Sequence, residues 1–199
     1  MYMYVYYLLM TLKQLGRAIE TPIFYSYQVE RLFFNEGKTM VNTQLSRLTK
    51  RGELVRLKRG VYKFADRELD DFVLAGWLYK PSYVSLESAL QVAGIIPDVV
   101  GQITSVTTVT SKEIKTSVGM FLYSKLAKNL YFGYRKIKDE KSGLFYNMAE
   151  PEKALLDWIY IRGIRGLEST RVNRDDLNKK KLKDYSKIYP EWVRKVLYE

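Results

Sequence analysis

The clearest alternation of hydrophobic and polar positions lies between Thr39 and Phe64. Its first half carries apolar residues at the i, i+4, i+7 spacing of one buried helical face: Val41, Leu45 and Leu48. The opposite face carries polar and basic side chains: Thr43, Ser46, Arg47 and Lys50. This pattern predicts an amphipathic helix from Thr39 to Arg51, with the Thr39 hydroxyl as its N-cap and Gly52 as its C-terminal stop.

The second half alternates with the period of two that is typical of a strand. We take Arg59 and Gly60 as a two-residue type I′ loop, in which the second residue is commonly glycine. The predicted hairpin then pairs Lys58 with Val61, Leu57 with Tyr62, Arg56 with Lys63, and Val55 with Phe64. In this register one face is apolar and the other carries the basic side chains Arg56, Lys58 and Lys63.

A helix with a basic outer face, followed by a basic-tipped hairpin, is the arrangement that a winged helix-turn-helix presents to DNA. The candidate DNA-binding residues are Thr43, Gln44, Ser46, Arg47, Lys50 and Arg51 on the helix, and Arg56, Lys58, Arg59 and Lys63 on the hairpin. Arg47 is best suited to bidentate guanine contact, Gln44 could read adenine, and the others would mainly hold phosphates. An ordinary solvated helix face carries similar residues, so the hairpin is what favours DNA.

Two further helices are predicted before this segment, from Tyr2 to Leu15 and from Tyr25 to Phe34. Together with the hairpin they define an N-terminal domain of residues 1–67. The opening run MYMYVYYLLM is hydrophobic, but it lacks a basic n-region and a small-residue cleavage site, and it is too short to span a bilayer. We therefore assign it to the first helix and expect no membrane association.

Residues 68–199 predict a mixed α+β domain with a small, mainly antiparallel sheet. One helix is predicted from Glu68 to Lys80, and two more are predicted to follow the N-cap residues Ser85 and Asn173. A further helix is predicted to begin with Pro151 as its first residue, and a last one near Pro190. Strands are predicted at Ile103–Val109 and Val118–Tyr123, and as a hairpin of Leu130–Ile137 with Leu144–Met148. The whole chain is thus expected to be α+β, with a winged helix-turn-helix first.

Charge and the missing residue types narrow the function. Lys and Arg outnumber Asp and Glu by 33 to 22, which gives a net charge of +11. This charge favours a polyanionic binding partner, nucleic acid first and an anionic membrane surface second. Solubility alone could also account for it. The chain has no Cys and no His, which excludes disulfides, thiolate or imidazole zinc sites, cysteine nucleophiles and histidine bases. We expect no enzymatic activity, no cofactor and no metal. A lack of Cys fits a reducing cytoplasm.

Three features of the second domain allow more than one interpretation. Glu150, Glu152 and Asp157 could hold a metal, but helix-dipole and surface roles account for them. The aromatic residues Tyr131, Phe132, Tyr134, Phe145 and Tyr146, close to Arg135, Lys136 and Lys138, have the composition of an RNA-stacking surface, although such residues more often form the core of a half-buried sheet. The lysine run from Lys179 to Lys183 is either a solvated face or a second phosphate-contacting patch.

Three stretches in order along the chain are similar to one family. These stretches are RLTKRGELVRLKRGVYKF, PSYVSLESALQVAGI and AEPEKALLDWIY. The chain resembles, from about Leu45 to Tyr160, the AbiEi family of antitoxins from type IV toxin–antitoxin, abortive-infection systems. The aromatic first helix and the lysine-rich run depart from that pattern.

The resemblance implies an N-terminal winged helix-turn-helix, a C-terminal antitoxin domain, and repression of the protein's own operon through inverted repeats in double-stranded DNA. It implies a functional partner, an AbiEii-type nucleotidyltransferase toxin, with no stable complex required, and it fits a monomer or a DNA-assembled dimer. Carried over by position, the DNA contacts would be Thr43, Gln44, Ser46, Arg47 and Lys50 on the helix, with Arg56, Lys58 and Arg59 in the wing.

Two other classes of function stay open at this point. The winged module could be a protein-interaction domain whose basic face docks an acidic partner or the toxin itself. A transferase or nuclease that uses Asp and Glu with a metal is disfavoured, because the sequence lacks His and any tight carboxylate motif.

Overall fold

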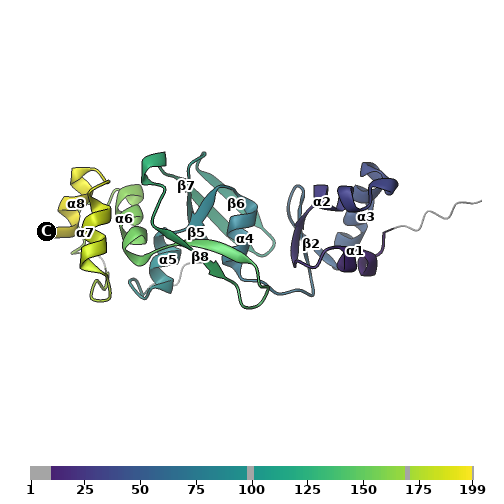
Figure 1. The fold of residues 1–199 in the computed structure, drawn as a ribbon, viewed down its shortest axis with the longest axis horizontal. Helices are drawn as coiled ribbons and strands as arrows, with labels where there is room; N and C mark the ends of the chain where they lie inside the picture. Colours follow the sequence, from purple (N-terminus) through teal and green to yellow (C-terminus); the bar gives the residue numbers. More distant parts are fainter. Residues whose placement is uncertain (1–9, 98–100, 169–170, 199) are drawn as a thin grey trace, which may run out of the picture. The chain divides into compact units, whose positions relative to one another are not determined.

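The protein is an α+β protein that divides into two compact units (Figure 1). The computed structural model describes residues 10–97, 101–168 and 171–198. One unit is Met1–Leu69 with Thr116–Val118, and the other is Asp70–Lys115 with Gly119–Glu199. The expected α+β class is confirmed. None of the helices in the described ranges has the length and hydrophobicity needed to cross a bilayer.

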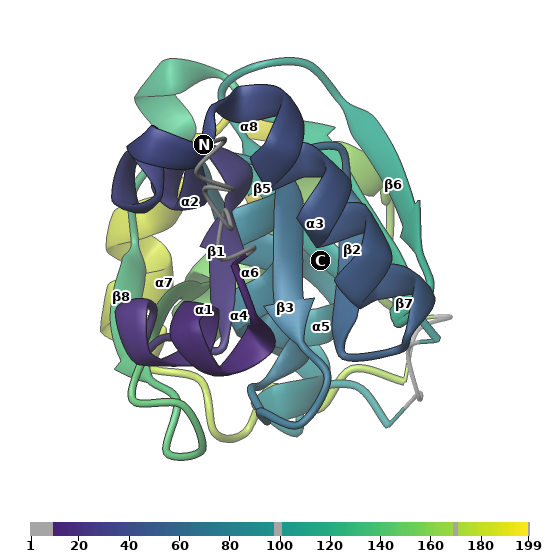
Figure 2. The same cartoon turned by 90° about the vertical axis from the view of Figure 1, so that its right-hand side faces the viewer.

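The first unit combines helices with a three-stranded antiparallel sheet in the strand order β1-β3-β2 (Figure 2). Its elements are α1 Leu12–Ala18, β1 Ile23–Tyr25, α2 Ser26–Leu32, the 3-10 turn η1 Phe34–Glu36, α3 Lys38–Lys50, β2 Leu54–Lys58 and β3 Val61–Phe64. The helices bury Leu15, Val29 and Leu45 in one core with Phe24 and Phe64 of the sheet. Burial of each such side chain contributes about 1.5–3 kcal/mol to folding.

The first described helix begins later than the sequence pattern predicts. Thr11 forms a capping box with Gln14, whose backbone N–H donates to the threonine hydroxyl over 3.2 Å, and α1 therefore starts at Leu12. The helix continues through Gly16 to Ala18, so Gly16 does not end it. Met10 and Thr11, which the predicted Tyr2–Leu15 helix includes, are not helical, and the part of that helix on residues 2–9 lies outside the described residues.

Helix α3 matches the predicted amphipathic helix except at its first residues. Its N-cap is Gly37, with a φ of 72°, and not Thr39, which lies inside the first turn. Its end is a Schellman motif: the Gly52 N–H donates to the Thr49 carbonyl and the Glu53 N–H to the Leu48 carbonyl, both over 3.0 Å. Gly52 has a φ of 75°, so the predicted glycine stop is confirmed.

The hairpin register differs from the prediction by one residue beyond a β-bulge. Lys58 pairs with Val61 as predicted, but the register shifts at Leu57, and Arg56 pairs with Tyr62, Val55 with Lys63 and Leu54 with Phe64. A type I′ turn needs positive φ at both loop residues, and of the two only Gly60 has it, at 77°. Positive φ at the second loop residue alone fits neither type I′ nor type II′, and turns outside these two types splay the strands, so a bulge restores the local twist. The bulge therefore brings Arg56 to the same face of the hairpin as Tyr62.

The pattern also missed the third strand of this sheet. Ile23, Phe24 and Tyr25 pair antiparallel with Lys63, Tyr62 and Val61, and α2 begins directly afterwards at Ser26. The Ser26 N–H donates to the Gly60 carbonyl over 2.9 Å. The hairpin tip is therefore fastened to the start of α2.

Arg67 joins the end of the hairpin segment to α1 and the loop after it. Its guanidinium donates to the carbonyls of Gly16, Ile19 and Glu20 over 3.0, 2.7 and 2.9 Å. It also lies 3.9 Å from the centre of the Phe64 ring. One side chain thus satisfies carbonyls at the C-terminal end of α1, where a cation suits the helix dipole.

We expect Arg67→Ala to destabilise the first unit by about 2–3 kcal/mol, because charge-assisted hydrogen bonds to several carbonyls are lost together. All three tryptophans (Trp77, Trp158 and Trp192) belong to the second unit. A shift of the unfolding curve in far-UV circular dichroism, with the tryptophan fluorescence curve unchanged, would identify the first unit. Equal shifts in both curves would contradict the prediction.

The second unit contains a six-stranded sheet in the order β6-β7-β5-β4-β9-β8. Its strands are β4 Ser82–Val84, β5 Ile103–Thr107, β6 Lys112–Thr116, β7 Gly119–Lys125, β8 Tyr134–Lys138 and β9 Phe145–Ala149. The pairs β4–β5 and β8–β9 are antiparallel, whereas β4–β9 and β5–β7 are parallel. The sheet is larger than predicted and contains parallel as well as antiparallel pairs, because the sequence pattern did not predict β4 and β6. The β8–β9 hairpin was predicted.

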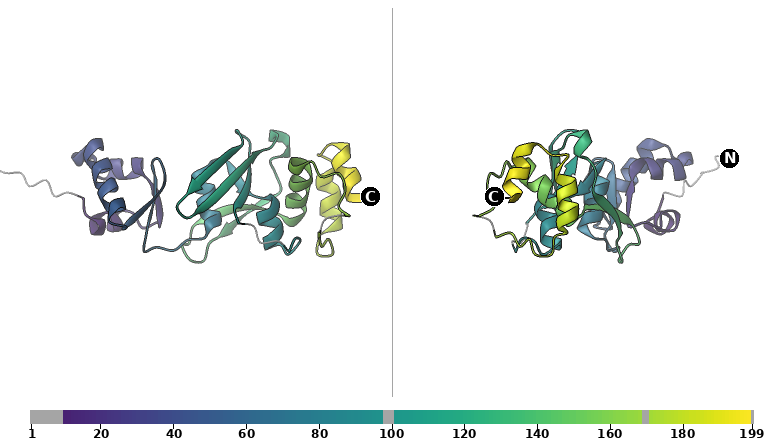
Figure 3. Two further views of the ribbon diagram at one scale, coloured as in Figure 1. Left: turned by 180° about the vertical axis from the view of Figure 1, so that it is seen from behind. Right: turned by 60° about the vertical axis from the view of Figure 1, so that its left-hand side comes forward.

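Helices cover this sheet in layers. They are α4 Asp71–Leu78, α5 Leu86–Val92, α6 Pro151–Arg162, α7 Lys179–Ser186 and α8 Glu191–Tyr198. Helix α6 lies between α5 on one side and α7 and α8 on the other (Figures 1 and 3). Pro151 is the first residue of α6, as predicted, whereas the cap of α7 is Asn178 and not Asn173.

A buried polar cluster holds α6 to β4 and to the loop before α8. Lys153 and Asp157 are both 0 % exposed and form an ion pair one helical turn apart. The Lys153 ammonium also donates to the hydroxyls of Tyr83 and Tyr189 over 2.8 and 2.7 Å, and both hydroxyls donate on to Asp157. Ser85 donates to Asp157 over 2.8 Å, so it occupies the cap position of α5 without capping it.

The cluster corrects two interpretations of the sequence. Asp157 has no surface role, and the Ser85 hydroxyl is committed to Asp157 and not to a backbone N–H of α5. Burial raises the pKa of Tyr83 and of Tyr189 far above the ordinary value, and the charge of Asp157 adds to the effect. Burial also lowers the pKa of Lys153, against the opposing attraction of Asp157. Every donor of the Lys153 ammonium has an acceptor.

Glu87 of α5 ties that helix to α6 at a less buried point. Its carboxylate accepts from Arg162 Nε over 2.7 Å, from Arg162 Nη2 over 2.9 Å and from Trp158 Nε1 over 3.0 Å. Burial alone raises the pKa of Glu87, but these hydrogen bonds and the Arg162 charge outweigh it and hold the pKa below its ordinary 4.5. Glu87 is therefore an acid-sensitive contact between the two helices.

Because the folded-state pKa of Glu87 is lowered, its contribution to stability is present above the unfolded pKa and is lost as the pH falls through the folded pKa. We expect the second unit to lose stability between about pH 5 and pH 3, and Glu87→Gln to flatten that slope. Urea unfolding followed by tryptophan fluorescence at several pH values measures both. An identical slope in wild type and Glu87→Gln would exclude this role.

Candidate nucleic-acid interface

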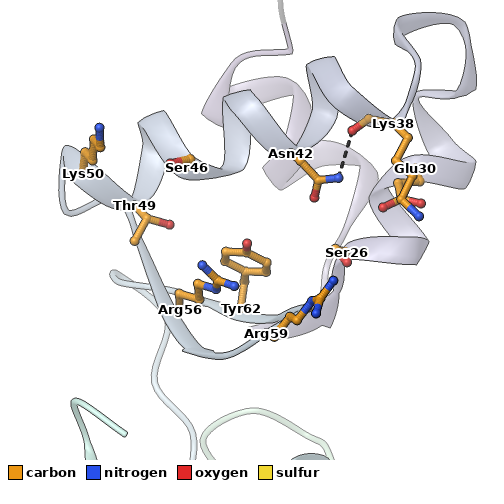
Figure 4. Close-up of a pocket in the computed structure, with 11 residues that line it drawn as sticks. Ser26, Glu30, Lys38, Asn42, Ser46, Thr49, Lys50, Arg56, Arg59 and Tyr62 are labelled. Carbon is orange, nitrogen blue, oxygen red and sulfur yellow. Dashed lines mark hydrogen bonds between the residues drawn. The ribbon is translucent and has the colours of Figure 1, made fainter.

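A groove of about 490 Å³ lies in the first unit between α3 and the β2–β3 hairpin (Figure 4). Residues of α2 and Tyr62 of β3 complete its walls. The lining side chains are Ser26, Glu30, Lys38, Asn42, Ser46, Thr49, Lys50, Arg56, Arg59 and Tyr62. Polar groups from two elements thus face each other across an open channel.

The helix side of the groove is one polar stripe of α3. Asn42, Ser46 and Thr49 follow the i, i+4, i+7 spacing, so they lie on one face. The Asn42 amide donates to the Lys38 carbonyl over 3.0 Å, and the Thr49 hydroxyl to the Leu45 carbonyl over 2.8 Å. These bonds hold the Asn42 and Thr49 side chains along the helix, and both Asn42 and Ser46 are exposed.

The hairpin side carries two arginines. Arg56 is exposed and shares a face with Tyr62 because of the bulge, and Arg59 lies at the tip. Figure 4 shows both guanidinium groups below α3, that of Arg56 beside the Tyr62 ring and that of Arg59 toward Ser26. Over the described residues, neither guanidinium forms an ion pair with a carboxylate.

The electrostatics of the groove are positive. Lys38, Lys50, Arg56 and Arg59 line it, and Glu30 is the one carboxylate among its described lining residues. Cations on opposing walls of a channel favour a ligand with several negative charges, such as a nucleic-acid backbone.

The structure divides the ten predicted DNA-binding residues into groups. Ser46, Lys50, Arg56 and Arg59 line the groove. Thr43 and Arg47 are exposed on α3 beside it, and the Thr43 hydroxyl donates to the Thr39 carbonyl over 2.9 Å. Lys58 is half-buried next to the loop and pairs with Val61. Arg51 follows the helix and forms an ion pair of 3.2 Å with Glu53.

For two of these residues, burial and contacts contradict the predicted DNA-binding role. Gln44 is 5 % exposed, because it lies one turn before Leu48 and therefore faces the core, and so it is not positioned to read a base. Lys63 pairs with Val55 on the face opposite Tyr62, and its ammonium donates to the Phe64 and Arg67 carbonyls over 3.2 and 3.4 Å. Neither side chain reaches the groove.

Sequence reasoning missed several groove residues. Asn42 and Thr49 could have been found from their helical spacing to Ser46, and Lys38 lies one turn before Asn42. Ser26 and Glu30 had no local signal, because the fold alone brings α2 to the hairpin tip.

Comparison with protein-family models and with curated proteins found no match to this sequence.

Proposed function

We propose that the first unit is a winged helix-turn-helix that binds double-stranded DNA, with α3 entering the major groove and the β2–β3 hairpin as the wing. The observation that carries the proposal is the groove between these elements, where Arg56 and Arg59 face α3 and have no carboxylate partner within the described ranges. The order of helices and strands also supports it, because α2 and α3 are joined by a short turn and the hairpin follows directly.

In this proposal the exposed side chains have different tasks. Arg47, exposed on α3 beside the groove, reads guanine through two hydrogen bonds. Ser46, Lys50, Arg56 and Arg59 bind phosphates and fix the register of the protein on the duplex. Gln44 has no role at the DNA.

We further propose that the protein is an AbiEi-like antitoxin that represses its own operon in the cytoplasm. The first unit supplies repression at inverted repeats, as a monomer or a DNA-assembled dimer, and the second unit counteracts a nucleotidyltransferase toxin without a stable complex. The support is the ordered trio of sequence stretches. The buried cluster adds to it, because Tyr83 and Ser85 of the second stretch bond to Asp157 of the third. No catalytic step is assigned to either unit.

The test is a fluorescence-anisotropy titration of full-length protein with a duplex from its own upstream region and with a scrambled duplex. Specific binding with a log–log salt slope of about −5, as expected for about six neutralised phosphates, supports the proposal. Equal affinity for both duplexes, or a slope near zero, contradicts it.

A second candidate function is protein interaction by the first unit, docking an acidic partner or the toxin directly. The observation in its favour is a set of exposed apolar side chains on α2, η1 and α3: Leu32 at 51 %, Phe34 at 73 % and Met40 at 38 %. Failure of the purified protein to bind its upstream DNA at moderate salt would favour this second function.

A further inference from the structure

The second unit has a groove of its own, about 380 Å³ in volume, which the proposed DNA interface does not use. Its walls come from the end of α4, the segment before β4, and strands β8 and β9. Aromatic rings and lysines dominate the lining: Trp77, Lys80, Tyr134, Lys136, Phe145 and Tyr146. Among its described lining residues there is no carboxylate.

Strand register places two rings and a lysine on the same face. Lys136 pairs with Asn147, and because side chains alternate along a strand, Tyr134, Lys136, Asn147 and Phe145 all point to that face. β8 is the last strand of the sheet, so this ribbon lies at an edge. The arrangement is a short platform with a cation between two aromatic side chains.

The Phe145 and Tyr134 rings are exposed to solvent, and the Tyr134 ring is also held in place by a neighbouring ring. Phe145 is 49 % exposed and Tyr134 is 37 % exposed. The Tyr134 ring is stacked on Tyr83, with ring centres 4.6 Å apart and planes 20° apart, and Tyr83 is held by the buried cluster. A ring that is fixed from below loses little freedom when a ligand stacks on it, and this favours binding.

Cations lie directly beside these rings. The Lys136 ammonium is 4.3 Å from the centre of the Phe145 ring, and the Lys80 ammonium is 4.9 Å from the centre of the Trp77 ring. Lys138 of β8 is exposed and shares the face of Lys136, because the two lie two residues apart on the strand. The site therefore suits a ligand that carries flat rings and negative charges at short intervals.

We propose that this groove binds a single-stranded nucleic-acid segment, with bases stacked on Phe145 and Tyr134 and phosphates held by Lys136 and Lys80. Stacking platforms interleaved with cations are how proteins bind single strands without reading sequence. A duplex keeps its bases stacked on one another and offers these rings no base, so the ligand differs from that of the first unit.

The test is an anisotropy titration of a labelled twelve-nucleotide oligouridylate with full-length protein that carries Arg56→Ala, which reduces any contribution of the first unit. Phe145→Leu is expected to weaken binding about tenfold, because it keeps an apolar side chain but removes the stacking face. Lys136→Gln is expected to weaken binding and to reduce the salt slope by about 0.7.

Lys115→Gln is the matched control, because Lys115 carries the same charge but lies on β6, away from the groove. The affinity of this variant for the oligouridylate should stay within about twofold of that of the parent protein. Tryptophan fluorescence melting confirms that each variant is folded. Unchanged affinity in folded Phe145→Leu and Lys136→Gln would overturn the proposal. Displacement of the strand by uridine monophosphate at equal nucleotide concentration would overturn it too, since the site would then hold a mononucleotide.

Discussion

Arg56→Ala is expected to weaken binding of the upstream duplex about tenfold and to reduce the magnitude of the salt slope by about one, equally for all duplex sequences. The reason is that Arg56 is exposed, lies across the groove from α3, and forms no ion pair with a described carboxylate. Its guanidinium is therefore available to hold a phosphate. Anisotropy titrations at several salt concentrations give both quantities.

Two variants give this prediction its contrast. Lys63→Ala removes the same charge from the same hairpin, but Lys63 lies on the opposite face and bonds to backbone carbonyls, so we expect a change within about twofold. Arg47→Ala should instead relax the base preference at one position of the operator. If Lys63→Ala were as damaging as Arg56→Ala, the groove would not be the phosphate site.

The second large effect is expected from Asp157→Ala, which should destabilise the second unit by about 3–5 kcal/mol. The change leaves the Lys153 ammonium fully buried without its counter-ion, and it removes the acceptor of three hydroxyls. Urea unfolding followed by tryptophan fluorescence measures the loss, because every tryptophan belongs to this unit.

Asp157→Asn keeps an oxygen acceptor and should cost less than Asp157→Ala. Asp184→Ala removes a carboxylate of the exposed pair with Lys187, where both side chains are more than half exposed, and should leave the urea midpoint almost unchanged. A similar small effect for Asp157→Ala would mean that the buried cluster contributes little to folding.

Sequence reasoning succeeded where the signal is local. The apolar spacing of Val41, Leu45 and Leu48 predicted α3, Gly52 predicted its end, and Pro151 predicted the start of α6. Each of these features depends on residues within one or two helical turns. The same holds for the loop at Arg59 and Gly60, which determined the position of the hairpin tip.

The failures arise where distant residues decide the outcome. The bulge at Leu57 follows from the backbone conformation of the loop, which the alternation of residues does not reveal, and β1 is too short to show a period. Asp157 looked like a surface carboxylate because its partners Tyr83, Ser85 and Tyr189 are far away in sequence. The groove was predicted in part, since its α3 and hairpin walls are local but its α2 wall is not.

The parallel pairing of β4 with β9 sets an order of events during synthesis. Val84 meets Met148, so the β4–β9 pair in the second sheet cannot form until Met148 has left the ribosome, whereas the first sheet closes once Phe64 is available. Pairing across a long loop is slow, and domains of a nascent chain fold as they emerge. A chain released in that interval would carry a folded first unit alone, and under the proposed function it would occupy DNA without the activity of the second unit.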